Sequence, residues 1–144
     1  MKMEVEHMGD LQFSVATRGH EIYCDQPEAN GGYDEAMTPP EMFLGALGAC
    51  AAFYAVDHLK RKKLAFEGTR VQASAEKLKN PTRLGEIVLH VTAPQKLNTE
   101  EQEELLRSVE KCILHNTLTH PPEIRTEIDA GPVEEASEAE LVAA

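Results

Sequence analysis

The chain has 144 residues, which is long enough for one domain to bury a core of its own. Its formal net charge of −11 argues against a nucleic-acid partner, because phosphate binding requires clustered Lys and Arg. No uninterrupted apolar run approaches the roughly 20 residues of a membrane-spanning helix, and the N-terminus lacks the apolar stretch of a signal peptide, so we expect a cytoplasmic protein that does not enter the membrane.

The first quarter of the chain is predicted to form strands. Apolar residues alternate through Leu11, Phe13 and Val15, and again through Ile22 and Cys24. This period of two is typical of half-buried strands, and the Arg-Gly pair between the two runs can turn the chain. A Gly- and acid-rich loop without periodicity follows, and loops of this length are often functional or mobile.

A long helix is predicted to begin at a strong N-terminal signal. Thr38 can serve as the N-cap, Pro39 suits the first helical position, and Glu41 completes a capping box. Residues 42–59 are apolar almost all round and rich in Gly and Ala, so other elements can approach closely. We expect this helix at the centre of the protein or at an interface, with Cys50 about twelve residues, or roughly 18 Å, from its start.

The second half of the chain is predicted to form a hairpin, a further helix and a last strand. Residues 68–77 and 85–93 have the pattern of two strands joined by turn residues. Residues 99–118 have apolar positions at helical spacing, with Cys112 among them. Residues 123–129 can form a strand after the helix stops at two prolines.

The order of these elements indicates the fold class. Strands, a long helix, strands, a helix and a strand are typical of an α+β domain in which helices pack on antiparallel sheets. We expect a single domain over residues 1–133. Residues 134–144 carry four Glu and no basic residue, and are predicted to be an acidic tail.

Three cysteines, Cys24, Cys50 and Cys112, are the main candidates for chemistry. An odd number without close pairs does not describe a disulfide framework, so we expect reduced thiols. Each can be a small buried hydrophobe, which is the commonest role of free cysteine and the simplest interpretation of Cys24. If two apolar helix faces pack together, Cys50 and Cys112 can come within disulfide reach, about 5.5–6 Å between Cα atoms.

Other chemistries have weaker support in the sequence. His115 follows Cys112 by three positions, but a metal site would need further ligands such as Cys50, His58 or His120. Because the sequence has no close Cys-x-x-Cys or His-x-x-x-His pair, we expect no metal. A Cys–His hydrolase built from Cys50 and His115 would lack an oxyanion site beside a mid-helix nucleophile. No Gly-rich loop of the phosphate-binding type precedes a helix.

A resemblance to the OsmC/Ohr family, the osmotically inducible protein C-like proteins, rests on the stretches TPPEMFLGALGACAAF and VEKCILHNTL. It covers about residues 11–129, and the lead-in is more similar to the broader OsmC-like branch. The resemblance implies antiparallel sheets packed around a long central cysteine-bearing helix, in an intertwined homodimer. It also implies a stress-response peroxidase without a cofactor. Cys50 would attack an organic hydroperoxide and become a sulfenic acid, and Cys112 would resolve it to a disulfide that an external dithiol reduces.

The same resemblance assigns two further site residues. In the active reductases an arginine held by a glutamate stabilises the thiolate, and Arg18 and Glu41 occupy these roles by position. However, no Lys or Arg stands between Gly19 and Leu59, and Arg18 lies in an expected turn. Glu41 stands nine residues before Cys50, one fewer than in the reductases. Two alternatives therefore stay open: a non-catalytic OsmC-like protein that binds a small apolar ligand in the same cleft, and a structural dimer whose thiols only pack.

Overall fold

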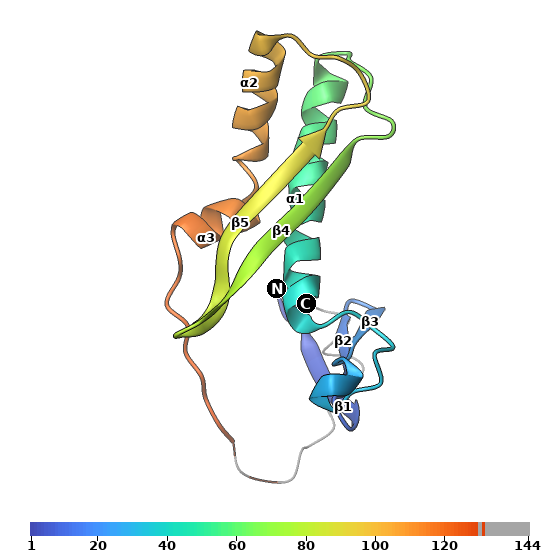
Figure 1. Ribbon diagram of the computed structural model, residues 1–144, viewed down its shortest axis with the longest axis vertical. Helices are drawn as coiled ribbons and strands as arrows, with labels where there is room; N and C mark the ends of the chain where they lie inside the picture. The colour runs from blue at the N-terminus through green and yellow to red at the C-terminus, as the bar shows by residue number, and fades with distance from the viewer. Residues whose placement is uncertain (130, 132–144) are drawn as a thin grey trace. The chain divides into compact units, whose positions relative to one another are not determined.

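The computed structural model describes residues 1–129 and 131, so the predicted tail over residues 134–144 lies outside the described residues. The chain has an α+β fold (Figure 1). Its elements are β1 (Glu4–Gly9), β2 (Gln12–Thr17), β3 (His20–Cys24), the 3₁₀ turn η1 (Glu28–Asn30), α1 (Pro39–Arg61), β4 (Arg70–Lys79), β5 (Thr82–Thr92), α2 (Thr99–Val109) and α3 (Ile113–Thr119). They form two compact units: unit 1 is Met1–Met42 with the chain from Ile124 onward, and unit 2 is Phe43–Glu123.

Unit 1 contains a three-stranded antiparallel sheet in the order β1-β2-β3. The β2–β3 turn consists of Arg18 and Gly19, with φ of 49° and 74°. Two successive positive φ values match the twist of a two-residue hairpin, so the predicted turn is confirmed. The strand β1 was not predicted, because its sequence has few β-forming residues. It forms by pairing with β2.

The long helix α1 begins where the sequence predicts. The Glu41 carboxylate accepts hydrogen bonds from the backbone N–H of Thr38 at 2.7 Å and from the Thr38 hydroxyl at 2.8 Å. The backbone N–H of Met42 donates to the carbonyl of Thr38 at 2.9 Å and closes the first turn. These bonds satisfy groups that every helix start leaves unpaired, and α1 then continues for 23 residues.

Unit 2 is built from α1, the antiparallel β4–β5 hairpin and the two short helices (Figure 1). Its buried core comes from α1, α2 and the segment that leads into α2, and apolar side chains of β4 and β5 pack against it. The buried residues are Ala51, Ala55, Leu59, Leu97, Leu105 and Val109. A Cβ added at Gly48 would lie 3.7 Å from that of Ala73 on β4, so a small residue lets the hairpin approach α1 closely.

Two predictions about the last third of the chain were wrong. The helix expected over residues 99–118 is broken: α2 ends at Val109 and α3 begins at Ile113. Cys112 lies in the break with an extended ψ of 130°, so it stands at the N-cap of α3 and not inside a helix. Residues 123–129 form no strand, because no strand of the described chain pairs with them.

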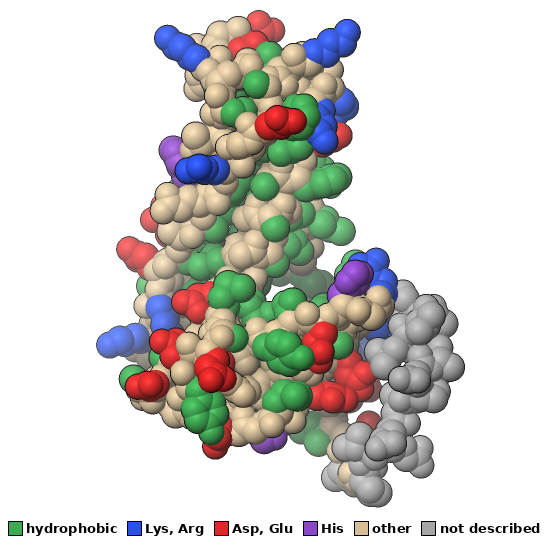
Figure 2. Space-filling model, turned by 90° about the vertical axis from the view of Figure 1, so that its right-hand side faces the viewer, with side chains coloured by type: hydrophobic (Ala, Val, Ile, Leu, Met, Phe, Trp, Pro, Cys, Tyr) green, Lys and Arg blue, Asp and Glu red, His purple; other side chains and the backbone are tan. Residues whose placement is uncertain are grey.

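One face of α1 is apolar and exposed. Phe43 and Phe53 are 42% and 66% exposed, and Ala46 and Ala49 between them are exposed too. Their spacing places the four on one side of the helix. Figure 2 shows hydrophobic side chains at the surface on the side of the molecule that it views. By length and composition α1 could cross a membrane, with 33% of its apolar window buried, but the core helix of a soluble protein passes the same test.

Candidate functional site

α1 and α2 run antiparallel, and polar contacts join them in one register. Near the end of α1, Lys62 Nζ lies 2.6 Å from a carboxylate oxygen of Glu104 on α2. One turn earlier, His58 Nε2 lies 3.9 Å from the same carboxylate. One turn earlier again, the hydroxyl of Ser108 donates to the backbone carbonyl of Tyr54 at 3.3 Å. Lys62 and His58 thus both meet Glu104, and the next turn back along α1 meets Ser108, which is later in the chain.

The next step in this register brings the two predicted thiols together. The side chains of Cys50 and Cys112 are close enough for Cys50 to act on the pKa of Cys112, and both cysteines are free thiols. The contacts between the two segments, called here the helix seam, involve Cys50, Tyr54, His58 and Lys62 on one side and Glu104, Ser108 and Cys112 on the other. Because both sets are spaced by four residues, each forms one stripe along its own segment.

The Cys112 thiol is the more buried of the pair, at 1% exposed. Burial raises its pKa above the ordinary value, and the hydrogen bond with Cys50 raises it further. The backbone N–H groups of Leu114 and His115 act in the opposite direction but do not outweigh burial. A hydrogen bond that raises the pKa of an acid favours its protonated form.

Cys50 differs in its surroundings. It lies within α1 and is partly exposed, between the exposed Ala49 and the fully buried Ala51. It thus stands at the border between the buried face of α1 and the exposed apolar face. Of the two thiols, Cys50 is the one that a small molecule can reach.

An apolar groove of about 900 Å³ lies in unit 2. Its wall is formed by β5, α2 and α3, and includes Leu47, Ile87, Leu89, Leu105, Val109 and Leu118. The wall includes Leu47, three residues before Cys50, and His115, three residues after Cys112. Neither sulfur lines the groove itself. Its size and lining suit a small, mainly apolar molecule.

The other two predicted site residues belong to unit 1. Arg18 is exposed at the β2–β3 turn. The Glu41 carboxylate is occupied by Thr38, whose backbone N–H and hydroxyl hold the pKa of Glu41 below its ordinary value. In the part of the chain that the structure describes, no hydrogen bond or ion pair joins Arg18 to Glu41. Their predicted partnership is therefore not formed within one chain.

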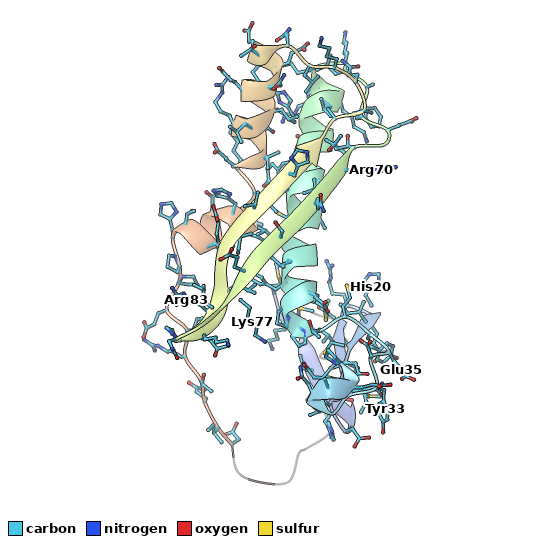
Figure 3. All side chains as sticks on the ribbon, viewed as in Figure 1. His20, Tyr33, Glu35, Arg70, Lys77 and Arg83 are labelled. Carbon is cyan, nitrogen blue, oxygen red and sulfur yellow. The ribbon has the colours of Figure 1, made fainter. Side chains whose placement is uncertain are left out.

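Several cations of unit 2 are engaged with carboxylates. The ion pairs are Arg61 with Asp57, Lys62 with Glu104, and Arg107 with Glu103. On the hairpin, Arg70 stands at the start of β4, whereas Lys77 and Arg83 lie near the turn at the opposite end (Figure 3). These ion pairs do not supply the thiolate-stabilising cation that the resemblance implies. Among the described residues, no group of three His, Cys, Asp or Glu could hold a metal ion.

A buried carboxylate in unit 1 was missed by the sequence reasoning. Asp25 is fully buried, and its carboxylate accepts hydrogen bonds from the backbone N–H groups of Gln26, Tyr33 and Glu35 at 2.7–3.1 Å and from the Gln12 amide at 3.4 Å. Burial alone would raise its pKa, but the hydrogen bonds outweigh burial and lower it. The acid-rich loop is thus tied to one carboxylate. Tyr33 and Glu35 lie close together within it (Figure 3).

The fold and the thiol pair define an α+β protein with two cysteines at a helix seam. Residues 32–127 match the family described as OsmC-like protein, and the chain belongs to this family. No curated protein matches the sequence.

Solved structures with the same fold come from several bacteria. A protein from Psychrobacter arcticus 273-4 has a TM-score of 0.75 at 22% identity, over 81% of this chain and 87% of that one. An OsmC like protein from Mycoplasma pneumoniae has a TM-score of 0.69 at 22% identity, over 83% and 87%. An organic hydroperoxide resistance protein OsmC from Legionella pneumophila has a TM-score of 0.63 at 19% identity, over 81% and 87%.

Proposed function

We propose that this protein is a thiol-dependent peroxidase that reduces organic hydroperoxides, with Cys50 as the attacking thiol and Cys112 as the resolving thiol. The observation that carries the proposal is the proximity of the two thiols, since Cys50 acts on the pKa of Cys112. Membership of the OsmC-like family supports it, as does the name of the Legionella pneumophila protein with the same fold, an organic hydroperoxide resistance protein.

The proposed reaction has three balanced steps. The Cys50 thiolate attacks the outer oxygen of the hydroperoxide, the O–O bond breaks, and the alkoxide takes a proton and leaves as the alcohol. Cys50 is then a sulfenic acid. The Cys112 thiol attacks this sulfur and forms the disulfide, and the hydroxyl leaves as water. An external dithiol returns two electrons and two protons, which restores both thiols and gives its own disulfide.

The surroundings of the two cysteines suit these separate roles. An attacking thiol must be reached by substrate and must ionise, and Cys50 is the partly exposed member of the pair. Cys112, whose pKa is raised mainly by burial, keeps its proton until the sulfenic acid forms. The apolar groove of unit 2 can hold the organic part of the peroxide.

The test is the intact mass of the reduced protein after addition of one equivalent of cumene hydroperoxide. We expect a loss of about two hydrogen masses, and peptide mapping should assign it to a Cys50–Cys112 disulfide. Cys50→Ser should abolish peroxide consumption. Cys112→Ser should still consume one equivalent but stop at a Cys50 species that has gained one oxygen. Cys24→Ser is the matched control and should behave as the wild type. Turnover that survives in Cys50→Ser would refute the assignment.

A second candidate function is the binding of a small apolar ligand without catalysis. It is favoured by the groove of about 900 Å³ and by the lack of Lys and Arg between Gly19 and Leu59. The pH dependence of Cys50 alkylation by iodoacetamide distinguishes the two candidates. Fast alkylation at pH 6 supports the peroxidase, because the thiolate is the reactive form. Alkylation that accelerates only near pH 8.5, as in a free thiol, favours the ligand-binding protein.

We further propose that the protein is a homodimer of the cytoplasm, where thiols are kept reduced. A second copy would cover the exposed apolar face of α1, which includes Phe43 and Phe53. The extended segment after α3 supports the same proposal. Its Ile124 and Ile128 are 87% and 88% exposed, and a partner strand could shield them. Exposed apolar surface of this kind marks interaction sites in proteins.

A further inference from the structure

His58 is a member of the helix seam with a buried ring nitrogen that makes no hydrogen bond among the described residues. The side chain is buried, at 8% exposed, among the apolar residues of α1 and α2. Its Nε2 atom has no hydrogen-bond partner among the described residues. The nearest acceptor is the Glu104 carboxylate at 3.9 Å, which is too long for a hydrogen bond. A buried polar atom without a partner carries a free-energy cost that apolar residues would avoid.

Four charged groups influence this imidazole. Glu104 is on α2, Asp57 and Arg61 are on α1 with His58, and Lys62 directly follows the end of α1. The carboxylate of Glu104 is already bound by Lys62, whose Nζ lies 2.6 Å and 2.8 Å from its two oxygens. Asp57 is paired with Arg61 at 2.8 Å. Both carboxylates that act on His58 are thus already paired with Lys62 or Arg61, whose positive charges lower the pKa of the imidazole.

We propose that His58 makes the helix seam sensitive to protons, so that acidification loosens α2 from α1 and weakens disulfide formation between Cys50 and Cys112. The link is the register of the seam. His58 faces Glu104 one turn before the Ser108–Tyr54 hydrogen bond. The thiol contact follows one turn beyond that bond. A shift of α2 beside His58 would be carried along the helix to its end at Val109, three residues before Cys112.

The sign of the effect follows from burial. Burial lowers the pKa of His58 below its ordinary value of 6.5, against the opposing effect of Glu104, while Lys62 and Arg61 lower it further. The closed seam therefore favours the neutral imidazole, and a loosened seam, with His58 in water, binds a proton more tightly. The stability of the seam is fully present above about pH 6.5 and is lost as the pH falls below that value.

The measurement is the equilibrium between the thiol pair and a glutathione buffer. Cys50 and Cys112 give two electrons and two protons to one glutathione disulfide, which yields the protein disulfide and two glutathione thiols. Samples equilibrated between pH 5 and 7.5 are quenched with acid, alkylated and weighed by mass spectrometry. The wild type is compared with His58→Leu, which cannot titrate. Cys24→Ser is present throughout, so that the third thiol does not interfere.

We expect the ratio of the two equilibrium constants, wild type over His58→Leu, to fall by about fivefold or more between pH 7.5 and 5. The proton release from the thiols is common to both proteins and cancels in the ratio. His58→Gln, a polar side chain that does not titrate, should follow His58→Leu if the latter is unstable. His20→Leu removes an exposed histidine of unit 1 and should follow the wild type.

Two results would overturn the proposal. A ratio that is constant with pH would show that His58 does not act on the thiol pair. No disulfide at any pH in either protein would show that the seam does not hold the thiols in reach. Neither result depends on peroxide chemistry. Conversely, a pH-dependent ratio in a protein that fails to consume cumene hydroperoxide would support this inference and refute only the proposed peroxidase.

Discussion

At the scale of single residues, backbone N–H groups determine the charge state of a buried side chain. Asp25 shows this most directly, because three backbone N–H groups that follow it along the chain point at its carboxylate. The pKa is lowered although burial opposes this, so the charged form belongs to the native loop. A carboxylate in such a position organises a loop in the same way that an N-cap organises the start of a helix.

Replacing Asp25 by Asn should release the loop. The amide can offer only one acceptor oxygen, so its NH₂ group would face backbone donors that now lack a partner. We expect the amide hydrogens of Tyr33 and Glu35 to exchange with solvent faster, while those of β4 and β5 are unchanged. Hydrogen exchange followed by NMR measures both. Asp34→Asn, an exposed neighbour, is the matched control, and equal exchange in the two variants would contradict this role of Asp25.

The protonation of Asp25 has a defined pH window. Its folded-state pKa lies below the ordinary value of 3.8. The contribution of the carboxylate to stability is therefore present above pH 3.8 and is lost as the pH falls through the lowered folded-state pKa. The effect of His58 belongs to a separate window below about pH 6.5.

At the scale of elements, local signals were predictable and non-local ones were not. The start of α1 and the Arg18–Gly19 turn were read correctly because neighbouring residues determine both. The break before α3 was missed because the sequence around Cys112 has no Gly or Pro to announce it. Residues 123–129 alternate like a strand, but a strand also requires a neighbour to pair with, and alternation carries no information about that neighbour.

The helix seam was present in the sequence as a pattern that went unrecognised. Cys50, Tyr54, His58 and Lys62 recur every four residues on α1, and Glu104, Ser108 and Cys112 recur every four residues in the later segment. Side chains that recur at this interval fall on one side of a helix, so each series indicates a contact face. Matching the two series in antiparallel order would have predicted the thiol contact directly.

The Ser108–Tyr54 hydrogen bond should position the thiols. Ser108→Ala removes it, and the gain in helix propensity is the same in the reduced and the oxidised protein, so it cancels in the disulfide equilibrium. We expect the constant against glutathione to fall by up to about tenfold, the value of one typical hydrogen bond. Ser74→Ala, on an exposed position of β4, is the control. An unchanged constant in Ser108→Ala would mean that packing alone sets the distance between the thiols.

At the scale of the whole molecule, the distribution of apolar side chains is the main feature. Unit 2 buries one face of α1 under the hairpin and α2, and leaves the opposite face exposed. The rest of the chain is rich in carboxylates, so large aromatic side chains that are exposed to water on this face indicate an interaction surface. The exposed apolar face of α1 is therefore the physical reason for the proposed homodimer.

Phe53→Glu should separate the proposed dimer. Phe53 is 66% exposed in the single chain, so a carboxylate there leaves the fold of unit 2 intact but is strongly disfavoured in an apolar interface. Sedimentation equilibrium at micromolar concentration should give a dimer for the wild type and a monomer for the variant, with the same circular dichroism spectrum. Gln72→Glu adds an equal charge on an exposed position of β4 and should stay dimeric. A wild type that is monomeric at this concentration would contradict the proposal.

The break between α2 and α3 has a consequence for any covalent bond between the two sulfurs. Cys50 is fixed within a continuous helix, whereas Cys112 stands in a short turn that two backbone hydrogen bonds hold, from Lys111 to Ser108 and from Cys112 to Val109. A bond between the sulfurs requires some backbone displacement, and the turn is the softer of the two supports. Oxidation would thus reshape the surface around Lys111 and leave α1 straight. The redox state of the thiol pair would then change the surface of the protein, at a site that a protease or a reductant can recognise.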